Sequence, residues 1–144
     1  MPNRKIEGGC LCGAVRYRAT GEPKVMTLCH CRSCRHAAGA PSVAWVVFNA
    51  GDFAFISGEP TRYESSPGVT RTFCGRCGTP LTYQRDSRPD SIDATTATLD
   101  SPDDFAPSKE IWLSHRLRWE AANPAMQQFP ESSVQRSLRN LPTG

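Results

Sequence analysis

Seven cysteines in three short clusters are the residues of this 144-residue chain best suited to chemistry. The clusters are Cys10-Leu11-Cys12, Cys29-His30-Cys31-Arg32-Ser33-Cys34 and Cys74-Gly75-Arg76-Cys77. A C-x-x-C pair followed by glycine is typical of a metal knuckle, because the turn directs both sulfurs to one point and lets backbone N–H groups approach the thiolates. An odd number of clustered cysteines, in a chain without signs of secretion, favours metal ligation over a disulfide scaffold.

Zinc is the metal that this pattern favours. A C-x-x-C dithiol of the thioredoxin kind lies at a strand-to-helix turn of an alternating β/α chain, whereas these clusters lie between predicted strands. Iron–sulfur ligation also uses thiolates, but the cysteine spacings match neither common ferredoxin pattern.

The seven cysteines divide naturally into a closed four-ligand site and an open three-ligand site. Spacing alone leaves the partition open, since the 16 residues between Cys12 and Cys29 also suit a sequential zinc ribbon. Cys10 and Cys12 precede a predicted strand over 14–20, and Cys77 precedes another over 79–84. If these two strands are neighbours, the first and third clusters converge, and Cys29, Cys31 and Cys34 remain as a separate site.

The three histidines fit less readily as metal ligands. His30 lies between two cysteines on an extended segment and points to the opposite face, which favours a packing or hydrogen-bonding role. His36 follows Cys34 by two residues, a spacing that does not share a helix face. His115 could reach an open metal position, but a surface role is the simpler interpretation.

Most of the elements that must position these residues are predicted to be strands, because period-two alternation dominates. Val15, Tyr17 and Ala19 alternate with polar residues, as in a half-buried strand. The runs 41–48 and 53–56 flank a turn and predict a hairpin. Further strands are predicted over 62–64, 69–73, 79–84, 92–99 and 110–114. A short helix is predicted over 33–38, ended by Gly39, and a terminal helix or frayed tail over 131–140.

Length and charge limit the class of protein. A chain of 144 residues predicts one domain over 1–144, with a core of about residues 5–120 and a C-terminal tail over 121–144. The longest apolar run, Val43–Phe48, is too short for a bilayer, and the first nine residues lack the apolar stretch of a secretory signal, so we expect a cytoplasmic protein. The formal charge of +3 falls to zero with seven thiolates and two divalent cations, so nothing points to a nucleic-acid or membrane partner.

The cysteine motifs and their flanking residues resemble the glutathione-dependent formaldehyde-activating enzyme family, also described as the centromere-protein-V-like or GFA domain. The matching residues are Gly9-Cys10-x-Cys12-Gly13-x-Val15-x-Tyr17, Cys29-His30-Cys31-x-x-Cys34 with Gly39, Gly58-Glu59-Pro60, and Phe73-Cys74-x-x-Cys77-Gly78-Thr79-x-Leu81. The resemblance implies a mainly β fold similar to the Mss4-like β-tent, with short helices and two zinc ions per chain. It implies a structural zinc on Cys10, Cys12, Cys74 and Cys77, and a second, open zinc on the catalytic cysteines Cys29, Cys31 and Cys34.

The activity implied by the resemblance is that of a zinc-dependent carbon–sulfur lyase. Such an enzyme adds formaldehyde, or a related small electrophile, to the thiol of glutathione and forms S-hydroxymethylglutathione. Two other hypotheses are a non-catalytic Mss4-like binding or chaperone module and a thiol redox sensor. Four arginines could bind glutathione carboxylates, or could instead be solvated or balance thiolate charge: Arg32, Arg35, Arg71 and Arg76.

Overall fold

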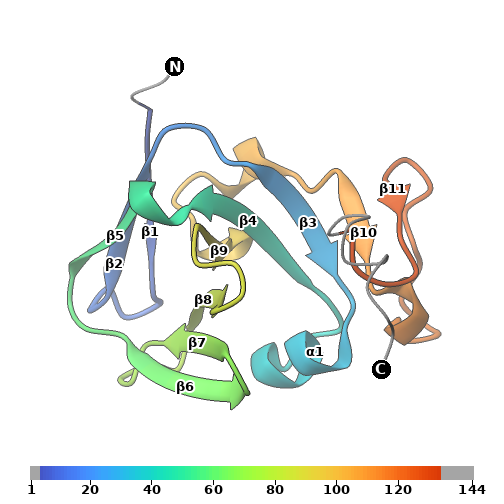
Figure 1. Cartoon of the computed structure of the whole chain (residues 1–144), viewed down its shortest axis with the longest axis horizontal. Coiled ribbons are helices and arrows are strands. Elements are labelled where there is room, and N and C mark those ends of the chain that lie inside the picture. Colours follow the sequence, from blue (N-terminus) through green and yellow to red (C-terminus); the bar gives the residue numbers. More distant parts are fainter. Residues whose placement is uncertain (1–3, 134–144) are drawn as a thin grey trace.

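The computed structural model describes residues 4–133 as two β-sheets with short helices. This confirms the prediction of a mainly β protein. Figure 1 shows β1, β2 and β5 on one side of the molecule and β10 and β11 on the opposite side, with β3 and β4 between them. Within residues 4–133, no helix has the length and apolar character needed to cross a bilayer.

The smaller sheet has three antiparallel strands in the order β1-β2-β5. They are β1 (Lys5–Gly9), β2 (Arg16–Thr20) and β5 (Phe53–Ser57). Tyr17 and Ala19 of β2 are fully buried, while Arg16 and Arg18 are half-buried, as the predicted alternation requires. The Tyr17 ring stacks on Phe53 at 5.1 Å between centroids.

The larger sheet has eight strands in the order β11-β10-β3-β4-β9-β8-β7-β6. Strand β10 pairs in parallel with β3 and β11, and the other pairs are antiparallel. The strands are β3 (Val25–Cys29), β4 (Val43–Asn49), β6 (Thr61–Ser66), β7 (Val69–Phe73), β8 (Pro80–Arg85), β9 (Ser91–Thr95), β10 (Lys109–Ile111) and β11 (Gln127–Gln128).

The two faces of this sheet carry separate apolar clusters. On one face, Val46, Phe48 and Ala94 pack in the same core as Tyr17 of the smaller sheet. A second cluster contains Cys29, Cys34, Val43 and Trp45 and is covered by partly buried residues that include Tyr83, Ile111 and Trp112. Successive residues of a strand point to opposite faces, so Trp45 and Val46 belong to different clusters. The second cysteine cluster therefore lies apart from the main core.

The predicted hairpin over 41–48 and 53–56 is wrong, although both runs are strands. Strand β4 lies in the larger sheet and β5 pairs with β2 in the smaller one. The short 3₁₀ helix Ala50–Asp52 separates them. Phe53 and Phe55 then pack against Tyr17. Burial of these aromatic rings against β2 therefore favours pairing of β5 with β2 over pairing with β4.

Several other boundaries differ from the sequence predictions. The strand predicted over 92–99 ends at Thr95 and continues as the 3₁₀ helix Thr96–Thr98, and the strand predicted over 110–114 ends at Ile111. Strands β1 and β3 were not predicted. Gly8 is required by close packing, since a Cβ there would lie 2.5 Å from the Thr98 carbonyl oxygen and the Tyr17 hydroxyl.

The internal helix agrees with its prediction. Helix α1 (Arg32–Ala38) contains the predicted segment 33–38, and Gly39 ends it in the left-handed conformation with φ 64°. The other short helices are the 3₁₀ segments Pro102–Phe105 and Leu113–His115. Of the helix or tail predicted over 131–140, residues 131–133 are not helical, and the remainder lies outside the described residues.

Candidate metal centres

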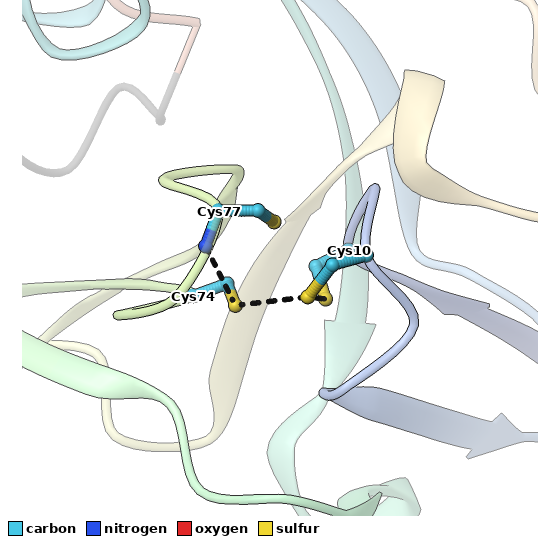
Figure 2. A group of neighbouring side chains, drawn as sticks. Cys10, Cys74 and Cys77 are labelled. Atoms are coloured by element: carbon cyan, nitrogen blue, oxygen red, sulfur yellow. Dashed lines mark hydrogen bonds between the residues drawn. The ribbon is translucent and has the colours of Figure 1, made fainter.

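The first cluster brings together the sulfurs of Cys10, Cys12, Cys74 and Cys77, all within 4.8 Å of one another. Cys10 Sγ lies 3.6 Å from Cys12 Sγ, which lies 3.8 Å from Cys74 Sγ. These separations are far longer than a disulfide bond. Figure 2 shows Cys10 on one loop facing Cys74 and Cys77 on another.

Two turns supply these sulfurs. The β1–β2 turn carries Cys10 and Cys12, and the β7–β8 turn carries Cys74 and Cys77. Thr79 joins the turns: its Oγ1 accepts a hydrogen bond from Leu11 N–H at 3.1 Å and lies 3.1 Å from Cys77 Sγ. The Thr79 hydroxyl and N–H lower the pKa of Cys77 to about 5.

Backbone N–H groups point at two of the sulfurs of this cluster. Val15 N–H donates to Cys10 Sγ at 3.3 Å. Arg76 N–H and Cys77 N–H both donate to Cys74 Sγ, each at 3.4 Å, and the second of these bonds is drawn in Figure 2. Such donors stabilise thiolates and fix their directions. The turns therefore place four sulfurs around one point, and backbone donors already point at two of them.

The partition expected from topology is the one that the sulfurs show, but the stated reason is wrong. Strand β2, which follows Cys12, and strand β8, which follows Cys77, belong to different sheets. The sulfurs converge because the two turns meet where the sheets approach, with a bridge between Gly8 and Leu99 nearby. Contact between loops, and not strand pairing, brings the cysteines together.

The second cluster consists of Cys29, Cys31 and Cys34, whose sulfurs also lie within 4.8 Å of one another. Cys29 ends β3, and Cys31 is the N-cap of α1, with its sulfur accepting a bond from Cys34 N–H at 3.2 Å. One extended step followed by one helical turn therefore aims three sulfurs at one point. Cys29 and Cys34 are buried, while Cys31 is half-buried.

The three thiols of the second cluster share protons unequally. Hydrogen bonds from Cys29 and Cys34 lower the pKa of Cys31 to about 2, and the nearby Arg71 charge acts in the same direction. The same contact with Cys31, together with burial, raises the pKa of Cys29. Because metal ligation needs all three thiolates, a cation bound here would displace protons from the cluster.

His30 turns away from the sulfurs, as predicted for a hydrogen-bonding residue. Its Nε2 lies 2.8 Å from Glu110 Oε1 of β10, and both side chains are fully buried. The other carboxylate oxygen of Glu110 accepts a hydrogen bond from Asn123 N–H, and His30 N–H donates to the Ile111 carbonyl. The cysteine loop is therefore anchored to β10 and to the segment after it.

Neither of the other two histidines joins a metal-binding group within the described part of the chain. His36 is exposed on α1. His115 Nδ1 accepts a hydrogen bond from Arg32 N–H at 3.3 Å, and its ring packs on Trp112 at 4.9 Å between centroids. Trp112 has φ 58°, a conformation that costs free energy for a residue other than glycine.

Of the four arginines considered from sequence, Arg71 on β7 contacts the second cluster. Its Nη2 lies 3.7 Å from Cys34 Sγ. Arg32 and Arg76 are exposed, and Arg76 belongs to the loop of the first cluster. The Arg35 Nε atom is buried and has no hydrogen-bond partner among the described residues. Glu110 was not singled out, and Thr79 was named only within the family motif, since nothing in a lone glutamate or threonine marks it as a partner of a distant cysteine loop.

The donor sets fit zinc at both places. Zinc–sulfur bonds of about 2.3 Å in a tetrahedron place sulfurs about 3.8 Å apart, and the first cluster already shows separations of 3.6 and 3.8 Å. The second cluster offers three sulfurs and no fourth protein ligand among the described residues. That number is typical of a site that leaves one position for water or substrate.

Comparison with known proteins agrees with this chemistry. The family model described as glutathione-dependent formaldehyde-activating enzyme matches residues 5–115. A Halomonas elongata protein, provisionally named as such an enzyme, is 28% identical over 124 residues, covering 79% of this chain and 78% of that protein. An uncharacterized lyase of Schizosaccharomyces pombe is 34% identical over 81 residues, covering 55% of this chain and 57% of that protein's own length.

A solved structure shows the same fold. The crystal structure of a Rhodobacter sphaeroides protein superposes with a TM-score of 0.57 at 20% identity, covering 85% of this chain and 98% of that one. With the mainly β architecture, the short helices and the two cysteine clusters, this confirms the predicted Mss4-like fold class.

Proposed function

The chain belongs to the family of glutathione-dependent formaldehyde-activating enzymes, and from that premise we propose that it is a zinc-dependent carbon–sulfur lyase. The proposed reaction adds the thiol of glutathione, or of a similar small molecule, to formaldehyde or a related small aldehyde. The new bond joins sulfur to the aldehyde carbon, the carbonyl π electrons move to oxygen, and the thiol proton ends on that oxygen. No oxidant or reductant is consumed.

The observation that carries this proposal is the second cluster, where three sulfurs converge without a fourth protein ligand among the described residues. We propose that Cys29, Cys31 and Cys34 hold the catalytic zinc, and that the four sulfurs of the first cluster hold a structural one. A zinc ion with an open position supplies a positive charge that favours the thiolate form of an incoming thiol at neutral pH.

The surrounding residues prepare the second cluster for this role. The N-terminus of α1 fixes Cys31 and Cys34, and the His30–Glu110 contact fixes the loop between Cys29 and Cys31. Trp45 and the partly buried Trp112 pack against the buried cysteines and keep water from that side. Because Cys31 is only half-buried, a small molecule can approach from its side.

All seven cysteines are free, so we propose a reducing compartment, the cytoplasm, in which thiols persist. Small polar reactants then reach the site without a macromolecular partner.

Substitution of Cys31 by alanine tests the proposal. The variant should lose thiol-dependent formaldehyde consumption and one zinc ion per chain, since two sulfurs cannot replace three. It should remain folded and lose at least about 1 kcal/mol of stability, the usual cost of removing a helix N-cap side chain, to which the loss of zinc binding adds. Native mass spectrometry, a formaldehyde assay and thermal unfolding measure the three effects.

Ser33→Ala, an exposed position in the first turn of α1, is the matched control and should change none of the three readouts. A folded Cys31→Ala protein that consumes formaldehyde at the parental rate would exclude this cluster as the catalytic site. A parent that binds a partner protein but forms no thiol adduct would favour a binding module. Zinc release by mild peroxide, again without adduct formation, would favour a redox sensor.

A further inference from the structure

Arg71 is held rigidly beside the three-cysteine cluster. Its Nη2 lies 3.7 Å from Cys34 Sγ, and its Nε donates to Ser65 Oγ at 3.2 Å. The guanidinium carbon lies 4.9 Å from the centroid of the Tyr83 ring, which is the cross-strand neighbour of Arg71 on β8. A guanidinium fixed by a ring and two contacts loses little side-chain entropy when it binds a ligand.

A second arginine, Arg85, contacts the same tyrosine ring. The Tyr83 hydroxyl lies 2.6 Å from Arg85 Nε, and the Arg85 guanidinium carbon lies 5.9 Å from the ring centroid. Within residues 4–133, no carboxylate lies within 4.0 Å of a nitrogen of Arg71, Arg85 or Arg88. Three other arginines of this chain do form ion pairs with carboxylates: Arg4, Arg16 and Arg18.

The nearest acid in the same row of the sheet is Asp93, which pairs across the strands with Tyr83. Burial raises the pKa of Asp93 to about 6, while the charges of Arg88, Arg85 and Arg71 oppose that rise. One half-buried aspartate within the influence of three arginine charges leaves a positive excess beside the three-cysteine cluster.

Among the described residues, the guanidinium of Arg71 has only two hydrogen-bonding contacts, through Nε and one Nη atom. Arginine carries five N–H donors in a planar fork that matches a carboxylate. The remaining donors therefore suit an anion brought by a ligand at the second cluster. An uncharged thiol would leave them unused.

We propose that Arg71, supported by Ser65 and Tyr83, binds a carboxylate of the thiol substrate and so makes the site selective for anionic thiols. The inference rests on the proposed function and names its substrate class. Arg71 is a specificity-determining residue in this view, and the three cysteines remain the ligand set. Glutathione, with two carboxylates and one ammonium group, belongs to the favoured class.

The test compares two thiols on the zinc-loaded protein, without aldehyde. Titration calorimetry gives the Kd of glutathione and of uncharged 2-mercaptoethanol for the parent, Arg71→Gln and Arg71→Lys. For Arg71→Gln we expect a Kd for glutathione that is higher by about 10- to 100-fold, as for the loss of a charge-assisted hydrogen bond. The Kd of Arg71→Gln for 2-mercaptoethanol should change by less than about twofold. The Kd of Arg71→Lys for glutathione should lie between those of the parent and of Arg71→Gln.

Arg62→Gln is the matched control for charge. Arg62 lies on the neighbouring strand β6 opposite Thr72, and so points to the other face of the sheet. This variant should bind both thiols as the parent does.

Each other outcome has a definite meaning. Equal weakening of both thiols, or loss of zinc from Arg71→Gln in native mass spectrometry, would show that Arg71 serves the metal ligands, and would overturn the inference. Unchanged glutathione binding would also overturn it. A parent that binds neither thiol would instead contradict the proposed function, so the two failures are distinguishable.

Discussion

Backbone N–H groups donate to sulfurs in both cysteine clusters, but only the second also has a side-chain cation, Arg71, beside one of its sulfurs, that of Cys34. The first cluster joins two turns whose cysteines are 62 or more residues apart in sequence, and the second uses six consecutive residues. Four sulfurs complete a tetrahedral site, and three do not.

This difference supports the proposal that the first cluster stabilises the fold, whereas the surrounding fold holds the second cluster in position for chemistry. Removal of the first cluster would disconnect the two sheets at the point where their turns meet. Removal of a sulfur from the second would leave the surrounding strands in place, because Trp45, Val43 and the His30–Glu110 contact secure them independently. Ligands that are close in sequence and leave one metal position open are suited to catalysis. Ligands that are far apart in sequence and complete the coordination are suited to stabilising the fold.

The largest expected effect is the loss of folding in Cys74→Ala. Cys74 is fully buried, and its sulfur accepts two backbone N–H groups within the four-sulfur cluster. Structural zinc contributes about 10 to 16 kcal/mol of apparent binding free energy in zinc-finger peptides, which exceeds the stability of many domains. Circular dichroism and zinc content should show an unfolded, metal-poor chain. A folded Cys74→Ala protein with a parental melting temperature would remove the distinction between the two clusters.

A smaller effect is expected from Glu110→Gln, which perturbs the anchor of the second cluster and leaves all seven sulfurs intact. The carboxylate is fully buried and accepts hydrogen bonds on both oxygens, from His30 and from the N–H of Asn123. A glutamine amide has only one acceptor oxygen, so one of these two buried donors would lose its acceptor. We expect a loss of about 2 to 4 kcal/mol in urea unfolding. The exposed Glu59→Gln is the control and should stay within about 0.5 kcal/mol of the parent. Equal stability of both variants would show that the anchor contributes nothing.

The smallest effect concerns the pH dependence caused by Asp93, in the row of residues that carries Arg71. Burial raises the pKa of Asp93 to about 6 in the folded protein, above the ordinary value of 3.8. Between these values the folded state binds more protons than the unfolded state, so this group lowers stability as pH rises from about 4 to 6. Above pH 6 the ionised carboxylate lowers the free energy of unfolding by about 1 to 3 kcal/mol.

Asp93→Asn removes this titration. The variant should therefore be more stable than the parent at pH 7, and the advantage should shrink as pH falls toward 5. Urea unfolding at several pH values measures the difference in unfolding free energy between the variant and the parent. Any loss of metal at low pH affects both proteins alike and therefore cancels in this difference. The exposed Asp103→Asn should give a difference that does not vary with pH. A constant difference for Asp93→Asn as well would contradict the assigned pKa.

Short-range features of the fold were predictable where one pattern dominated. Alternation around Tyr17 gave β2, and Gly39 with Pro41 limited α1, since both signals are local. The hairpin over 41–56 failed because the choice of partner for β5 depends on aromatic burial against β2. The strand before His115 ends early at Ile111, because Trp112 takes a left-handed conformation and its N–H donates to the carbonyl of Glu131, which is distant in sequence.

The sequence by itself determined the ligand chemistry of this protein: seven thiols, the local three-sulfur group of Cys29, Cys31 and Cys34, and the family to which the motifs belong. These follow from residue types and from cysteines two or three positions apart, a spacing that a turn or a helix converts directly into geometry. Only the tertiary structure decided that the turns at Cys12 and Cys74 meet, that Glu110 anchors His30, and that Arg71 faces Cys34. These contacts span 37 to 80 residues, and such distances are set by the packing of whole sheets.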